Sequence, residues 1–227
     1  MWSHTRSLDV LLLVTTVAPA ELVRVATSFG PAGRGERART ARTAGLGVPA
    51  AYLAVTGLAA ALVLSAGTAP ASLGRWAAGP LWVLAAVGAG CALVGLEFVV
   101  GAAPKVLRGA RGLRLGVRRG PGAAGPAFLV SIALTAVAEE VLYRGLWIGT
   151  LHERLQFPAW LAIGCAALGY ALGHLFFGGL TVVQKLLSGA VFGTLLTASG
   201  SLAVPLAAHL AQNLTVYALA RKQASAP

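Results

Sequence analysis

The chain has 227 residues, of which 57% are hydrophobic and 11% are charged, whereas a soluble domain carries about 25% charged residues. This composition and a mean hydropathy of +0.76 exclude an ordinary soluble protein and predict that lipid surrounds most of the chain. The net charge of +11 does not indicate a nucleic-acid partner, because the basic residues lie mainly between apolar segments, where they set membrane topology.

Windows of about 20 apolar residues predict an all-α, polytopic bundle with about seven membrane spans. The predicted spans are 8–28, 44–66, 76–101, 126–150, 157–177, 180–199 and 201–220. Glu21 and Arg24 interrupt the first span, although their spacing allows an ion pair on one helix face. Very short connections at residues 178–179 and 199–201 join the last spans. The last four spans are therefore expected to form a tight antiparallel four-helix core.

The basic residues predict the orientation in the membrane. Under alternating crossing, twelve fall on one side: Arg34, Arg37, Arg39, Arg42, Lys105, Arg108, Arg111, Arg114, Arg118, Arg119, Arg221 and Lys222. The other side receives Arg6, Arg75 and Arg154. The positive-inside rule then places the N-terminus outside and the C-terminus in the cytoplasm. A cleavage-site pattern at residues 18–20 leaves a signal peptide as the alternative, and residues 102–125 form either an interfacial helix or a solvated loop.

Two adjacent carboxylates lie inside the predicted span 126–150. An ionisable side chain in mid-membrane costs about 2.5–3.5 kcal/mol on insertion scales and marks a candidate functional site. Glu140 and Arg144 are four residues apart and can pair on one helix face, whereas Glu139 points about 100° away. One arginine neutralises one carboxylate, so Glu139 is suited to general acid–base chemistry. The alternative is an ion-paired patch that joins helices.

Polar residues in two later spans extend this set. His174 follows Tyr170 by one turn, and His209 and Asn213 share a helix face, although each feature alone is also typical of hydrogen bonding between helices. A carboxylate with a neutral imidazole can deprotonate water, and a histidine with an asparagine can donate to an oxyanion. Glu139, His174 and His209 could instead hold zinc, but the sequence contains no HExxH motif.

The predicted depths of these residues differ. At 1.5 Å per residue, Glu139 and His209 lie about 17–20 Å from the cytoplasmic ends of their spans, and His174 lies about 5 Å from its end. Either the predicted boundaries are displaced or the helix that carries His174 is tilted or shifted. A cavity that opens toward the cytoplasmic half would accommodate the set.

Three segments carry a family resemblance: EEVLYR at 139–144, YALGH at 170–174 and HLAQN at 209–213. Together they resemble the CPBP family of intramembrane proteases, also called the Abi or CAAX-protease and bacteriocin-processing family, whose ordered pattern is EExxxR, FxxxH and HxxxN. The resemblance covers about residues 126–220, with Tyr170 in place of the family's Phe. It implies that Glu139 activates water with His174, that His209 and Asn213 stabilise the oxyanion, that Arg144 positions the glutamates, and that Glu140 supports or replaces Glu139.

The resemblance also implies the activity and the partners. We expect a glutamic-type intramembrane endopeptidase with no cofactor favoured, and a zinc-dependent version as the alternative. Its substrate would be a membrane-associated protein or peptide, such as a CAAX tail or a myxosortase-like C-terminal sorting signal, in a prokaryotic inner membrane. The expected organisation is N-terminal spans with basic cytoplasmic loops at 1–125, the catalytic core at 126–220 and a cytoplasmic tail at 221–227.

Two rival functions use the same residues. Glu139, Glu140 and His209 could relay protons or bind cations in a transporter or channel. The chain could also be a noncatalytic scaffold or immunity protein that retains the motifs. The sequence contains no evidence for an oligomeric state.

Overall fold

The computed structural model describes residues 4–17, 19, 34–109 and 126–224, and the regular structure in these ranges is helical. The α-helices are α1 (His4–Thr15), α3 (Arg34–Ser65), α4 (Pro80–Leu107), α5 (Pro126–Glu139), α6 (Ala159–Leu172), α7 (Gly179–Ser199) and α8 (Ala203–Ala224). The shorter elements are 3-10 helices η1 (Ala71–Gly74) and η4 (Leu175–Phe177) and π-helices η2 (Glu140–Ile148) and η3 (Thr150–Arg154). The all-α prediction is therefore confirmed.

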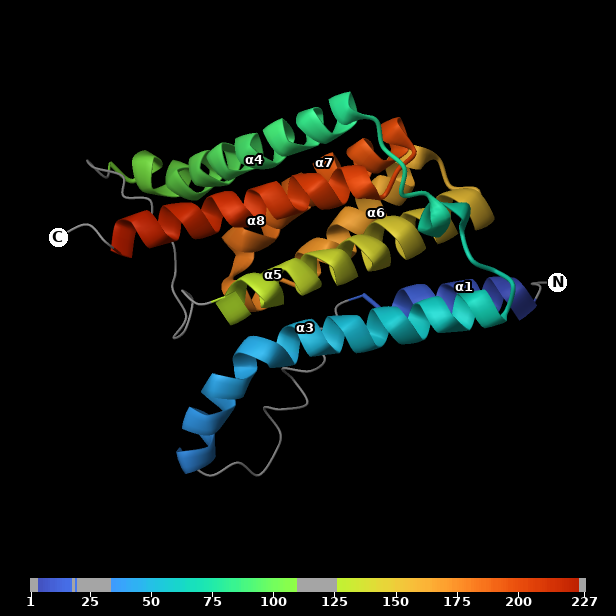
Figure 1. Cartoon of the computed structure of the whole chain (residues 1–227), viewed down its shortest axis with the longest axis horizontal. Helices are drawn as coiled ribbons and strands as arrows, with labels where there is room; N and C mark the ends of the chain where they lie inside the picture. The colour runs from blue at the N-terminus through green and yellow to red at the C-terminus, as the bar shows by residue number, and fades with distance from the viewer. Residues whose placement is uncertain (1–3, 18, 20–33, 110–125, 225–227) are drawn as a thin grey trace.

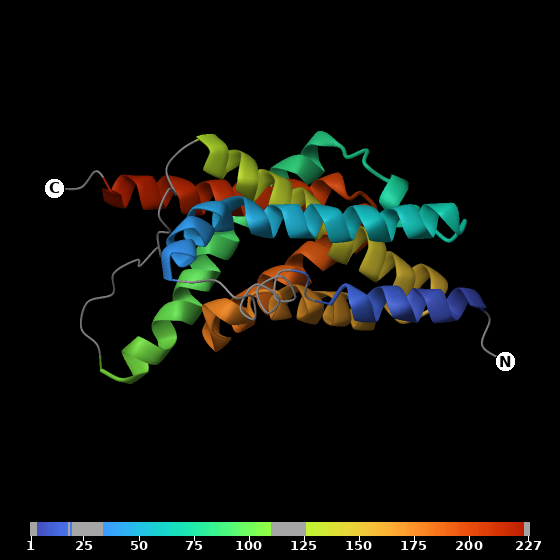
Figure 2. The same cartoon turned by 90° about the horizontal axis from the view of Figure 1, so that it is seen from below.

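The α-helices form an elongated bundle in which consecutive helices run in opposite directions (Figures 1 and 2). Residues 126–154 continue without a break from α5 through η2 and η3. Each of the seven predicted spans thus contains a helix of the bundle, although α1 covers only part of the first. α8 lies along α4, and α7 lies between α6 and α8.

Two helices in the described ranges, α4 and α7, are long and apolar enough to cross a membrane, and the apolar stretches Pro49–Ser65 and Ala159–Leu172 are shorter. The predicted number of seven spans is therefore not confirmed. The low hydropathy of two of the remaining helices has a physical cause. The run from α5 contains Glu139, Glu140 and Arg144, and α8 contains His209 and Asn213, so the polar residues lower the hydropathy of these helices.

The predicted short connections are present. Gly178, with φ of +102°, precedes α7, and Gly200, with φ of +67°, ends it. Side chains rarely adopt these positive φ values, so glycine allows both sharp reversals. They place α6, α7 and α8 side by side as an antiparallel unit.

Two predicted boundaries were wrong. α3 begins at Arg34 rather than near residue 44, so part of the expected basic loop is helical. Figure 1 shows that α3 is bent, and the helix contains Pro49, an internal proline of the kind that bends helices. α6 ends at Leu172, five residues before the predicted end of that span. The Glu21–Arg24 pair, the 18–20 pattern and residues 110–125 of the 102–125 segment lie outside the described residues.

The π-helix η2 forms the centre of the core. Its hydrogen bonds close wider turns than those of an α-helix, and eight of its nine residues are buried. Gly145 and Gly149 let the loop before α4 approach closely, because an added Cβ would collide with Leu73 or with Pro70 and Ser72. Ser72 Oγ donates to the Gly145 carbonyl oxygen at 2.9 Å. This packing fixes the helical segment that carries Glu140 and Arg144.

Candidate active site

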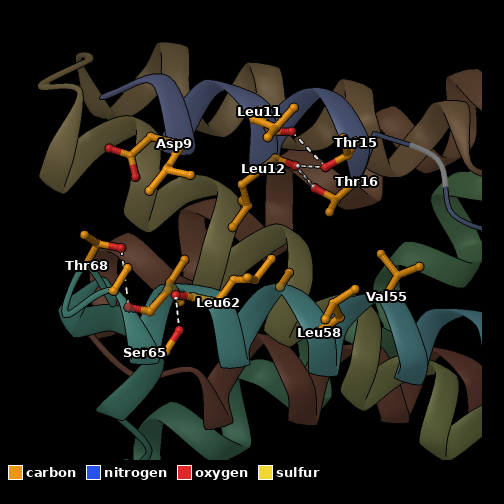
Figure 3. Close-up of a pocket in the computed structure, with 14 residues that line it drawn as sticks. Asp9, Leu11, Leu12, Thr15, Thr16, Val55, Leu58, Leu62, Ser65 and Thr68 are labelled. Carbon is orange, nitrogen blue, oxygen red and sulfur yellow. Dashed lines mark hydrogen bonds between the residues drawn. The ribbon is translucent and has the colours of Figure 1, made fainter. Parts of the chain in front are cut away.

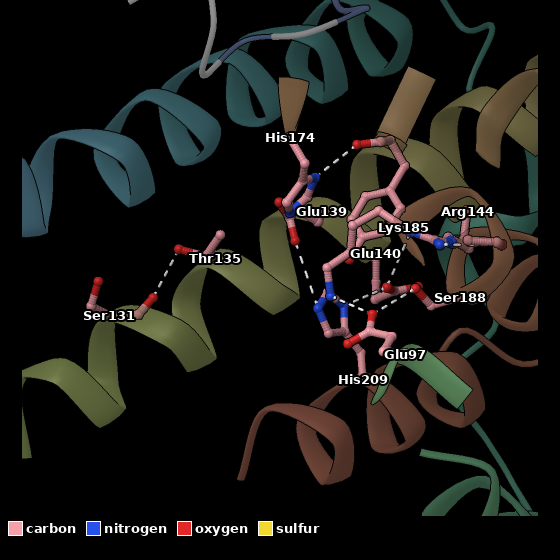
Figure 4. Close-up of polar contacts among 12 residues, drawn as sticks. Glu97, Ser131, Thr135, Glu139, Glu140, Arg144, His174, Lys185, Ser188 and His209 are labelled. Atoms are coloured by element: carbon pink, nitrogen blue, oxygen red, sulfur yellow. Dashed lines mark hydrogen bonds and ion pairs between the residues drawn. The ribbon is translucent and has the colours of Figure 1, made fainter. Parts of the chain in front are cut away.

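Glu140 is the centre of a buried polar cluster. Its Oε1 lies 3.2 Å from Arg144 Nη1 and 2.7 Å from His209 Nδ1. All three side chains are at most 3% exposed, and Figure 4 shows them gathered between the helices. The predicted Glu140–Arg144 pair is thus confirmed, whereas its contact with His209 was not predicted. Because an ionised carboxylate can only accept hydrogen bonds, this contact assigns a hydrogen to His209 Nδ1.

Glu139 lies on the other side of the His209 ring. Its Oε2 is 3.7 Å from His209 Nε2, and it is outside the ion pair that Glu140 makes with Arg144. One helical segment therefore presents two carboxylates to the two nitrogens of one imidazole. Glu140 is tied to an arginine, and Glu139 is the carboxylate that arginine does not neutralise.

Arg144 is held by more than its ion pair. Its Nη2 donates to the Gly189 carbonyl oxygen at 3.3 Å. Its guanidinium lies 4.6 Å from the ring centroid of Tyr170 and 5.2 Å from that of Phe192, distances at which a cation is attracted to an aromatic face. The Phe192 ring also stacks on His209, with centroids 5.0 Å apart. Sequence analysis did not single out Phe192 or Gly189, because neither residue type signals chemistry.

His174 reaches the cluster because α6 ends early. It lies in the turn between α6 and η4, and its Nδ1 is 3.0 Å from the Tyr170 carbonyl oxygen. A carbonyl oxygen only accepts, so Nδ1 carries the hydrogen and Nε2 is the basic nitrogen of this tautomer. The Tyr170 ring lies 4.9 Å from His174 and 6.0 Å from His209. The Tyr170 ring therefore contacts both histidines, and His174 lies just beyond the end of α6.

Asn213 lies one turn beyond His209 on α8 and is half-buried. Among the described residues, its side chain has no hydrogen-bond partner. The neighbouring Gln212 is 1% exposed, and within the same ranges neither of its side-chain polar atoms has a partner. Glu140 Oε2 is in the same situation. Buried polar atoms that lack protein partners are usually satisfied by water.

A zinc site would need three suitable donor side chains grouped together. In the described part of the chain, no three His, Cys, Asp or Glu side chains are grouped so that they could hold a metal ion. The ring nitrogens of His209 face Glu140 and Glu139. The arrangement of Glu139, His174 and His209 is therefore not that of a preformed metal site.

A cavity of about 530 Å³ lies elsewhere, between α1 and α3 (Figure 3). Apolar side chains such as Leu11, Leu58 and Leu62 line most of it, with Asp9 at one end. It shares no lining residue with the polar cluster. The candidate site is therefore defined by its polar contacts and not by this cavity.

Comparison with known families identifies the region that carries the cluster. Residues 121–215 match the family described as Rce1-like, type II CAAX prenyl endopeptidase Rce1-like. This region is therefore similar to the CAAX protease family. No curated protein and no solved structure matches the chain. The match contains all three motif segments, and α1, α3 and α4 lie outside it. The family is one of membrane-integral proteases, so the match supports an intramembrane endopeptidase.

Proposed function

We propose that the protein is a glutamic-type intramembrane endopeptidase with about seven spans, which hydrolyses a peptide bond of a membrane-associated protein or peptide. The observation that carries the proposal is the His209 ring between two buried carboxylates, of which only Glu140 is paired with Arg144. A purely structural ion pair needs one carboxylate, and this cluster contains a second.

Glu139 and His174 are the water-activating groups in this proposal. The His174 tautomer, with its Nδ1 hydrogen directed to the Tyr170 carbonyl, leaves Nε2 as the nitrogen that accepts a proton. As the water oxygen bonds to the substrate carbonyl carbon, its proton passes to Glu139 with help from His174. The same proton then goes to the departing amide nitrogen as the C–N bond breaks. This is general base and then general acid catalysis.

His209 and Asn213 stabilise the oxyanion. Glu140 accepts from Nδ1, so His209 can donate to the oxyanion through Nε2 when both ring nitrogens carry a hydrogen. The Asn213 amide lies one turn away on the same helix face and supplies a neutral donor. Donors fixed in advance lower the barrier because they need no reorganisation when charge develops. Arg144 and Glu140 hold His209 in position.

We propose two substrate classes for this activity. The family name points to a prenylated CAAX tail, and the alternative is a C-terminal sorting signal of the myxosortase type. Both are peptides that reach the site from the membrane. We place the protein in a prokaryotic inner membrane with the N-terminus outside and the C-terminus in the cytoplasm.

The decisive experiment compares membrane peptide fragments by mass spectrometry in cells that produce the wild type or Glu139→Gln at equal levels. We expect fragments that the wild type generates and that Glu139→Gln and His174→Ala do not. Identical fragment sets from correctly inserted proteins would exclude the proposed mechanism. The fragments also identify the substrate and distinguish a CAAX tail from a sorting signal.

A second experiment tests whether the activity requires zinc. We expect purified active protein to contain less than stoichiometric zinc and to keep its activity after treatment with a chelator. Activity that is lost to the chelator and restored by zinc would establish the metalloprotease version instead.

A further inference from the structure

A second polar cluster joins α4 to α7, and the proposed reaction does not use it. Glu97 on α4 and Lys185 on α7 form an ion pair of 2.9 Å, with both side chains 17% exposed. Gln184 Nε2 donates to the Glu97 backbone oxygen at 2.6 Å, and Ser188 Oγ lies 3.4 Å from the Glu97 carboxylate. One turn of α7 thus contacts a single residue of α4 three times, as Figure 4 shows in part.

Charged residues within membrane helices are costly and rarely present without a role. Adhesion between α4 and the bundle does not require this pair, because α4 already packs closely along α8. An added Cβ at Gly90 would collide with the Ala208 backbone, and Cys91 Sγ lies 3.5 Å from Thr215 Oγ1. Apolar replacements of a buried ion pair are often neutral or stabilising. The pair is therefore better explained by registry, since polar contacts fix how two helices are aligned.

The aligned segment of α7 leads directly to the active-site cluster. Ser188 precedes Gly189, whose carbonyl accepts from Arg144. Phe192, one turn further, stacks on His209 with an interplanar angle of 22°. Glu97 aligns α7 with α4, the Gly90 contact aligns α4 with α8, and Phe192 and His209 meet where α7 and α8 face each other. These three contacts connect α4, α7 and α8 in pairs. A shift of α7 along its axis would therefore move both the Gly189 carbonyl and the Phe192 ring.

We propose that Glu97 and Lys185 are positioning residues of the peptidase site. They fix the axial position of α7 and, through Gly189 and Phe192, the placement of Arg144 and His209. Glu97 lies outside the matched region 121–215, so the N-terminal part of the chain completes the geometry of the family's catalytic core. This inference rests on the proposed peptidase function.

The test uses Glu97→Leu combined with Lys185→Met, which replaces the ion pair with apolar side chains of similar size. The assay is cleavage of a synthetic peptide that spans a bond cut in membranes by the wild type and not by Glu139→Gln. We expect kcat to fall about tenfold or more, because small displacements of catalytic groups are costly, with KM and the detergent melting temperature little changed. The charge swap Glu97→Lys with Lys185→Glu should recover most of kcat. Asp9→Asn, which removes the distant Asp9–Arg154 pair, is the matched control and should leave kcat unchanged.

The results distinguish failure of the proposed function from failure of the positioning role alone. A wild type that generates no fragments beyond those of Glu139→Gln overturns the proposed function. A wild type that cleaves, together with an apolar double variant of equal kcat, overturns the positioning role alone. A double variant that loses melting temperature but keeps kcat per folded molecule would show that the pair only stabilises the bundle, which also overturns it.

Discussion

At the scale of single residues, Glu140 is the side chain on which two others depend. Glu140→Gln removes the charge that compensates Arg144, whose side chain is 1% exposed. Breaking a buried pair by removal of one partner destabilises by about 3–5 kcal/mol. Glu139→Gln leaves the Glu140–Arg144 pair intact, so we expect its stability to remain close to that of the wild type. Thermal unfolding in detergent measures the stability of both variants.

The control for this prediction is Glu140→Leu with Arg144→Met. This double variant should unfold at a higher temperature than Glu140→Gln, because it leaves no buried arginine charge without its partner carboxylate, and it should still be inactive. Equal melting temperatures for Glu139→Gln and Glu140→Gln would contradict the different roles assigned to the two carboxylates.

Asn213 provides a second contrast between stability and activity. Its amide has no hydrogen-bond partner among the described residues, so Asn213→Ala should change the melting temperature little. Loss of one oxyanion donor typically lowers kcat by about 10²–10³-fold, and we expect a decrease of this size in peptide cleavage. Leu214→Ala, at the adjacent position that is 52% exposed, is the control and should retain activity. Full activity of Asn213→Ala would remove this residue from the mechanism.

At the scale of secondary-structure elements, the close approach of α7 to α6 is set by Gly189. An added Cβ would lie 3.1 Å from Ala167 Cα, Ala167 Cβ and Tyr170 Cδ1. Gly189→Ala should therefore separate the helices, destabilise the protein by about 1–3 kcal/mol as overpacking does, and lower activity through Tyr170. Gly164→Ala is the control, because an added Cβ there meets nothing within 4 Å. Equal melting temperatures for the two variants would contradict this packing argument.

The same elements show what the sequence could predict. The glycines at 178 and 200 and the short connections predicted the antiparallel arrangement of α6, α7 and α8, and the i, i+4 spacing predicted the Glu140–Arg144 pair. Hydropathy did not predict the end of α6, because Leu175, Phe176 and Phe177 continue the apolar pattern beyond the turn at His174. The π-helix was also missed, because its wider turns depend on tertiary packing around Gly145 and Gly149 rather than on residue type.

At the scale of the whole molecule, the sequence missed contacts between distant segments. A window average tolerates one charge, so Glu97 and Lys185 were not singled out inside their spans. Their partnership depends on how α4 lies against α7, and spacing along the chain contains no information on that arrangement. The Glu140–His209 contact joins residues 69 positions apart, and for the same reason it was visible only in the structure.

The two ends of the bundle differ in charge, which bears on orientation. At one end, Asp9 pairs with Arg154 at 2.9 Å, and Glu153 accepts hydrogen bonds from the backbone at Ala71 and Ser72. At the opposite end, where α4 and α8 finish, the helices carry Lys105, Arg108, Arg221 and Lys222. Acidic residues thus balance positive charge at the first end, and basic residues predominate at the second. The positive-inside rule assigns an end of this second kind to the cytoplasm.

This orientation predicts the behaviour of reporters fused to the chain. Green fluorescent protein after Pro227 should fluoresce, and alkaline phosphatase at the same position should be inactive, because the first folds in the cytoplasm and the second requires the oxidising periplasm. A fusion within the loop that contains Arg75 should give the opposite pair of results. The control substitutes Arg221 and Lys222 with glutamine, which should weaken the bias without reversing it, since the remaining basic residues still outnumber those at the other end. Active phosphatase after Pro227 would reverse the assignment and place the C-terminal basic end outside.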